Sequence, residues 1–151
     1  MRAIWAGCAS MVLVCVSVVA RAQSAPITLS VDLTDAPRKI LHATEELAVQ
    51  PGPLTVVYPK WIPGEHGPTG PIENMAGFLI TADGKPVEWQ RDSVDMYAYH
   101  LTVPDGVTRL DIKIDFLATA SATGFSAGAS TSANLALLSW NTLLVYPDGA
   151  N

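Results

Sequence analysis

Apolar and polar residues alternate along most of the chain, and the alternation is clearest in residues 107–116. Every second side chain there is apolar, and charged side chains fill most of the positions between; the apolar set is Leu110, Ile112, Ile114 and Phe116. Side chains of a strand point alternately to its two faces, so this pattern predicts a strand with one buried and one solvent-exposed face. Such strands are typical of antiparallel sheets.

Similar patterns predict further strands, separated by turn-forming Pro, Gly and Asp residues. The predicted strands cover residues 27–33, 39–49, 54–58, 78–81, 87–89 and 96–103. A helical turn at Thr44–Leu47 is the alternative within 39–49, but a strand is favoured because Pro51-Gly-Pro53 ends the segment and another β-rich run follows. Strands at short spacing with turns between them predict an all-β domain, an antiparallel β-sandwich-like fold.

The sequence changes character after this region. Residues 118–134 are almost entirely Ala, Ser, Thr and Gly, a composition that predicts a flexible loop. Residues 135–146 are strongly apolar again, and Pro147-Asp-Gly149 forms a turn directly afterwards. Because domains rarely end this way, the pattern predicts a β-domain that is incomplete at its C-terminal end, with an apolar strand that lacks its neighbour.

The first 22 residues predict a signal peptide. Arg2 precedes an uncharged apolar run over residues 3–20, and small residues flank the position before Gln23 where a signal peptidase would cut. A membrane anchor is the alternative, since a spanning helix needs about 20 apolar residues. The polar residues that follow favour cleavage, so we expect an exported protein, periplasmic or extracellular, with no membrane attachment after cleavage.

Loss of this leader leaves residues 23–151, which are 129 residues without cysteine. A chain of this length forms one ordinary domain, here without a disulfide or a thiolate site. The net charge falls from −5 to −7, because Arg2 and Arg21 leave with the leader. No basic stripe is present, so we expect no nucleic-acid partner.

The histidines show no spacing typical of metal ligands. His42, His66 and His100 lie far apart, and none belongs to a His-Glu-x-x-His pair. His100 alternates within a predicted strand and is interpreted as a cross-strand or rim residue. The sequence therefore predicts no catalytic residue and no metal site in this chain.

One segment, residues 59–72, is suited to a functional site. It contains four prolines and three glycines, which exclude a helix and predict a stiff, shaped loop. The candidate substrate-binding residues on it are Trp61, Glu65 and His66: a carboxylate can neutralise an ammonium group and an imidazole can donate a hydrogen bond. The alternative is that Glu65 and His66 brace the loop and that Trp61 fills the core beneath it.

Several sequence blocks, taken in their order along the chain, resemble one family. The blocks are Asp35–His42, Pro51–Thr55, Tyr58–Ile72, Trp89–Asp92, Met96–His100, Val103–Gly106 and Leu135–Tyr146. Together they resemble the N-terminal domain of the glycyl aminopeptidase family of zinc metallopeptidases, over about residues 27–150. The run Trp-Ile-Pro-Gly-Glu-His at 61–66 is the most specific part of the resemblance.

The resemblance implies a larger parent, in which this β-domain precedes a thermolysin-like catalytic domain with the zinc motif and a PDZ-like domain. Neither of those domains is in this chain. The implied function is that of a non-catalytic domain that shapes or covers the parent's substrate cleft, with the catalytic domain as its partner and a peptide as substrate. Zinc is implied for the parent and no cofactor for this chain. The alternative function is a stand-alone exported module that binds a peptide or protein through the loop.

Overall fold

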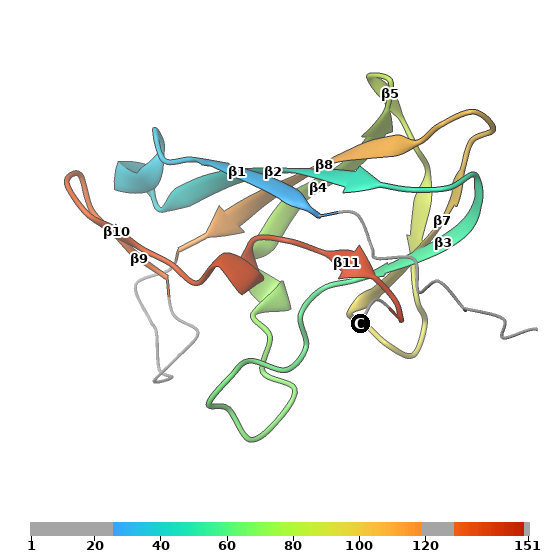
Figure 1. Cartoon of the computed structure of the whole chain (residues 1–151). Coiled ribbons are helices and arrows are strands. Elements are labelled where there is room, and N and C mark those ends of the chain that lie inside the picture. The colour runs from blue at the N-terminus through green and yellow to red at the C-terminus, as the bar shows by residue number, and fades with distance from the viewer. Residues whose placement is uncertain (1–25, 119–128, 150–151) are drawn as a thin grey trace, which may run out of the picture.

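The computed structural model describes residues 26–118 and 129–149. The described chain folds into antiparallel sheets with three single turns of 3₁₀ helix and no α-helix (Figure 1). The predicted all-β, sandwich-like fold is confirmed.

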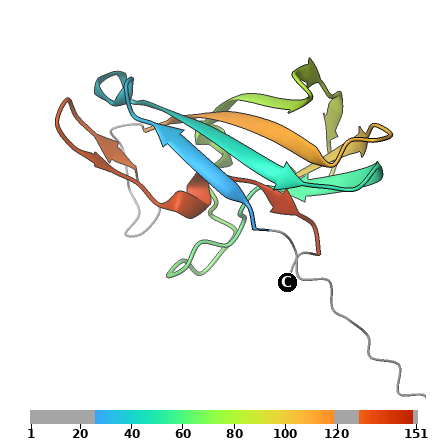
Figure 2. The same cartoon turned by 45° about the horizontal axis from the view of Figure 1, so that its top comes forward.

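The larger sheet has the strand order β1-β2-β8-β4-β5, and each strand is antiparallel to its neighbours. Figure 2 shows β1, β2 and β8 side by side. The strands are β1 (Thr28–Asp32), β2 (Ile40–Ala48), β8 (Arg109–Leu117), β4 (Met75–Ala82) and β5 (Lys85–Pro86). The prediction of a strand over 39–49 is confirmed, and a short 3₁₀ turn, η1 (Ala36–Arg38), connects β1 to it.

The second sheet has the order β11-β3-β7-β6. Its strands are β11 (Tyr146–Pro147), β3 (Gly52–Val57), β7 (Ala98–Val103) and β6 (Trp89–Arg91). In Figure 1, β3, β7 and β11 lie below the larger sheet. The apolar side chains that β8 was predicted to bury are at most 1% exposed, and they pack with buried residues of the second sheet such as Val56 and Val103.

An aromatic cluster connects the two sheets. Phe78 comes from β4 of the larger sheet, whereas Trp89 and Tyr99 come from β6 and β7 of the second. The ring centroids are 5.1 Å apart for Phe78–Trp89, 4.7 Å for Phe78–Tyr99 and 5.2 Å for Trp89–Tyr99. Tilted and edge-on arrangements of this kind are favourable for aromatic rings.

The flexible-loop prediction for residues 118–134 is wrong for its last part. Residues 119–128 lie outside the described residues, but β9 (Ser130–Thr131) pairs with β10 (Ala136–Leu137). Thr131 is buried, and the Lys39 ammonium group donates a hydrogen bond to its carbonyl oxygen. Of the described residues 129–134, Ala129 and Thr131 are buried and the others are exposed.

The expectation of one apolar strand over 135–146 is also wrong. A 3₁₀ turn, η3 (Trp140–Thr142), separates β10 from β11, and the Ser139 carbonyl accepts the Thr142 N–H at 3.0 Å and the Thr142 hydroxyl at 2.7 Å. Leu143 and Val145 are buried, and β11 pairs with β3. The end of the segment therefore pairs with β3 on one side and is an edge of the second sheet in the described structure.

The leader predicted over residues 1–22 falls outside the described residues and stays a prediction. No helix with the length and apolarity needed to cross a bilayer occurs in the part of the chain that the structure describes.

Candidate functional site

The proline- and glycine-rich loop connects β3 to η2 (Ile72–Asn74) and is closed at its base by backbone contacts. The Gly70 N–H donates to the Lys60 carbonyl at 3.0 Å. A Cβ atom on Gly70 would lie 1.9 Å from the Pro59 carbonyl oxygen, so the two arms of the loop approach as closely as only glycine permits. We call residues 59–71 the closed loop.

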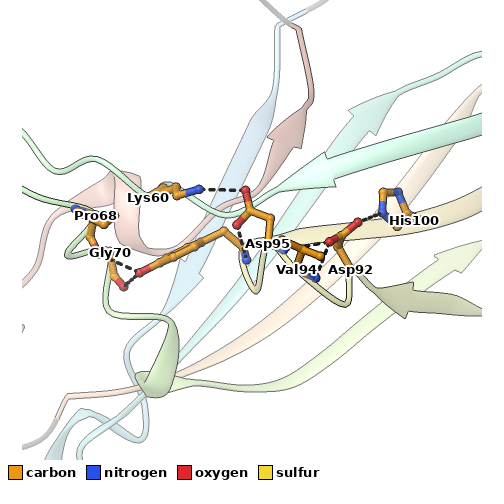
Figure 3. A network of polar contacts seen from close by, with 8 residues as sticks. Lys60, Pro68, Gly70, Asp92, Val94, Asp95 and His100 are labelled. Carbon is orange, nitrogen blue, oxygen red and sulfur yellow. Dashed lines mark hydrogen bonds and ion pairs between the residues drawn. The ribbon is translucent and has the colours of Figure 1, made fainter.

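A second loop, residues 92–97, is bonded to one arm of the closed loop (Figure 3). We call it the fastening loop. The Tyr97 hydroxyl donates toward the carbonyl oxygens of Pro68 at 3.0 Å and Gly70 at 3.2 Å, and the Lys60 ammonium lies 2.9 Å from the Asp95 carboxylate. The hydrogen bond from Lys60, followed by one from a backbone N–H, lowers the pKa of Asp95. The closed loop is thus held at its base and along one arm, as a stiff loop requires.

The three candidate residues all lie on the closed loop, but they differ in exposure. The interpretation of Trp61 as a core residue is wrong: its side chain is 64% exposed, and the adjacent Ile62, 4% exposed, is buried instead. His66 is exposed and Glu65 is half-buried. The Glu65 N–H donates to the Ile62 carbonyl at 3.0 Å, so the backbone of Glu65 takes part in the loop's own turn.

Exposed apolar side chains also occur on the segments bonded to the closed loop. Val94 and Met96, on the fastening loop, are 93% and 50% exposed. Trp140 is 60% exposed on η3, which is joined to the start of the closed loop by a 2.8 Å hydrogen bond from the Tyr58 hydroxyl to the Thr142 carbonyl. We call Trp61, Val94, Met96 and Trp140 the apolar loop residues.

His100 lies on β7 and bonds across the sheet, as predicted from its alternation. Its ring nitrogens lie 2.9 Å from the Thr55 hydroxyl and 2.8 Å from the Asp92 carboxylate. Asp92 also accepts the N–H groups of Val94 and Asp95, and these hydrogen bonds, the one with His100 first, lower its pKa. This carboxylate shapes the fastening loop (Figure 3).

His42 lies on the outer face of the larger sheet, between two carboxylates. Its Nδ1 is 2.7 Å from Asp115 and its Nε2 is 3.3 Å from Asp35. The hydrogen bond with Asp115, and then the one with Asp35, raise the pKa of His42. Glu45, three residues along the same strand, points to the opposite face, so its carboxylate lies apart from His42.

Glu45 is a residue that sequence reasoning missed. It occupies an inward position of β2, between the buried residues Ala43 and Leu47, and is 1% exposed. Burial raises its pKa to about 7, against the smaller opposing effect of a hydrogen bond from the Val145 N–H. The alternation of the sequence could have revealed that Glu45 is buried, because every odd position from 41 to 49 belongs to the buried face.

A family model describes this arrangement of strands. The model of the peptidase M61 N-terminal domain matches residues 28–151. The chain belongs to the peptidase M61 N-terminal domain family. No curated protein matches this M61 domain.

A solved structure shares the fold. It is an aminopeptidase N family protein from Idiomarina loihiensis, with a TM-score of 0.68 and 11% sequence identity. The match covers 82% of this chain but 20% of that one, so the M61 domain spans about a fifth of that protein's length. The likeness supports the fold of a peptidase N-terminal domain.

The described residues of the M61 domain do not fit a zinc site. Within 26–118 and 129–149, no group of three or more His, Cys, Asp or Glu side chains could hold a metal ion. A shallow groove of about 660 Å³ lies over β6 and β7 and includes Gln90 and His100, but none of the three candidate residues lines it. Trp61, Glu65 and His66 therefore lie outside this groove.

Proposed function

We propose that this M61 N-terminal domain is the non-catalytic part of an exported zinc metallo-aminopeptidase of the glycyl aminopeptidase type. In this proposal it shapes or covers one side of the parent's substrate cleft. The observation that carries the proposal is a closed loop, in a peptidase N-terminal domain, that presents Trp61 to solvent.

The physical argument concerns what such a loop can bind. Bonds at its base and side restrict the closed loop before any contact is made, so less conformational entropy is lost when a partner covers it. Aromatic side chains such as Trp61 and Trp140 remove a large apolar area from water when covered. The partner that we propose is the parent's own catalytic domain, which would also supply the zinc ligands, with a peptide substrate bound near Glu65 and His66.

Catalytic inactivity of this chain is the first test. Purified chain supplied with zinc is expected not to cleave glycyl or alanyl arylamides, because a hydrolytic zinc needs roughly three protein ligands and a water molecule. Release of the arylamine is measured beside a longer peptidase that contains His-Glu-x-x-His. Turnover that co-purifies with the chain and disappears in His66→Ala would contradict the proposal.

Glu65→Gln in the longer peptidase tests whether Glu65 of the closed loop binds substrate in the parent's cleft. The substitution preserves shape and removes charge. If Glu65 holds the substrate's amino group, kcat/KM falls about tenfold to a hundredfold, since a charge-assisted hydrogen bond contributes roughly 1.5–3 kcal/mol. A lower melting temperature with unchanged kinetic constants per folded molecule would assign Glu65 to bracing the closed loop instead.

A further inference from the structure

Glu45 is an acidic side chain enclosed by the core. On β2, Glu45 pairs with Leu29 of β1 on one side and with Ile112 of β8 on the other. Its side chain is 1% exposed. The Oε1 atom has no hydrogen-bond partner within the described residues. A buried polar atom without a partner is unfavourable, and it is more so when the group is charged.

The other carboxyl oxygen holds a distant part of the chain. Oε2 accepts the Val145 N–H at 2.9 Å, across 100 positions of sequence. Val145 directly precedes β11, which attaches to β3 through only two residue pairs, Tyr146 with Val57 and Pro147 with Val56. Proline has no N–H to donate, so hydrogen bonds on either side of the strand add to its attachment: the Val145 N–H donates to Glu45, and the Asp148 N–H donates to the Thr55 carbonyl at 2.9 Å.

Among the described residues, no charged side chain contributes to the pKa of Glu45. Burial and the Val145 N–H are the two causes that shift its pKa from the ordinary value of 4.5 to about 7. The opposing sheet presents Tyr58 and Tyr99 to the core, and burial raises both of their pKa values, so these phenols stay neutral near pH 7. The titratable side chains on β1, β2, β8 and β11 that lie outside the buried face are Asp32, His42, Glu46, Arg109, Asp111, Lys113, Asp115 and Tyr146.

We propose that Glu45 is a proton-dependent latch for residues 143–147. When the carboxyl group is protonated, the segment is seated on β3 with Leu143 and Val145 in the core. When the proton is lost to solvent, the buried negative charge favours release of the segment, which exposes Glu45 to water. The latch does not depend on the proposed function.

The direction with pH follows from the two states. In the released state the carboxyl group is solvated and has its ordinary pKa of 4.5, whereas in the seated state the pKa is about 7. The ratio of seated to released molecules is therefore highest below about pH 4.5. It falls about tenfold per pH unit up to about pH 7. Above that range both states are ionised and the ratio is constant, at roughly a hundredth or less of its acidic value.

Hydrogen exchange of the chain, followed residue by residue by NMR between pH 4.5 and 8, tests the latch. Protection factors of the Val145 and Tyr146 amides, corrected for intrinsic exchange, are expected to fall about a hundredfold across this range. Glu45→Gln is the matched variant, because its amide oxygen still accepts the Val145 N–H but carries no charge. Its protection at these amides is expected to be independent of the carboxyl titration.

Two results would overturn the latch. One is an equal fall in Glu45→Gln, which would assign the effect to another group, such as His42, whose pKa is raised by its hydrogen bonds with Asp115 and Asp35. The other is a parallel fall at the Ile114 amide of β8, which would mean unfolding of the whole domain. If the variant does not fold, the carbon-13 titration of the Glu45 carboxyl decides: a midpoint near pH 7 shared by the Val145 amide supports the latch, and a midpoint near 4.5 contradicts it.

Discussion

Gly70→Ala is expected to lower the free energy of unfolding by about 3 kcal/mol, the upper end of what overpacking costs. The added methyl carbon would lie 1.9 Å from the carbonyl oxygen of Pro59, 3.0 Å from its carbonyl carbon and 3.2 Å from the Cα of Lys60. These are backbone atoms, so no side-chain rotation relieves the clash. The arms of the closed loop must separate, which breaks the Gly70–Lys60 hydrogen bond and moves the Gly70 carbonyl away from Tyr97.

Gly67→Ala provides the control on the same loop. A Cβ atom at Gly67 would meet nothing closer than the Thr69 methyl group, at 3.9 Å, so the free energy of unfolding should change by less than about 0.5 kcal/mol. Urea and thermal unfolding of both variants measure the difference. Equal stability of the two variants would show that the close approach at Gly70 is not what closes the loop.

Tyr99→Ala is expected to cost about 3–5 kcal/mol of unfolding free energy, as is typical when a large aromatic side chain is removed from a core. Tyr99 is fully buried and contacts both Phe78 and Trp89, so its loss opens a cavity where the two sheets meet. Chemical denaturation, followed by the near-ultraviolet circular dichroism of the aromatic cluster, measures the loss.

Tyr99→Phe separates the ring from the hydroxyl group. The hydroxyl oxygen accepts a hydrogen bond from Arg91 at 2.9 Å, and the guanidinium group lies 5.2 Å from the ring centroid. The phenylalanine variant retains the ring contacts and should lose only about 1 kcal/mol. If the two variants were equally unstable, the hydroxyl bond to Arg91 within the second sheet, and not the aromatic packing between the sheets, would account for the stability that Tyr99 provides.

The strands could be predicted because their period of two is a local property. Residues 107–116 alternate clearly, and residues 39–49, where a helical turn was the alternative, also form a strand with one buried face. For residues 135–146, the periodicity does not predict which side chains are buried. A continuous apolar run does not reveal which side chains are covered, and here Leu135 and Leu137 are exposed whereas Leu143 and Val145 are buried.

The candidate site was only partly predictable, for a related reason. Proline and glycine content predicted a shaped loop, but its anchors, Asp95 and Tyr97, lie about 30 residues further along the chain and bear no local signal of their role. Trp61 was interpreted as a core residue because tryptophan is usually buried, although Ile62 beside it could fill the same space. Glu45 could have been recognised from its place in an otherwise apolar series, since a strand that buries Leu41, Ala43 and Leu47 also buries the residue between them.

The short outer strands of the two large sheets have a consequence for assembly. Three of the four edges of these two sheets are strands of two or three residues, namely β5, β6 and β11, and β5 and β11 each contain a proline. Edges this short give another polypeptide little to pair with, which protects a protein from growing into fibrillar aggregates. The five-residue β1 is the edge of the described chain that could template such growth, so the fate of this protein at high concentration depends on what shields β1.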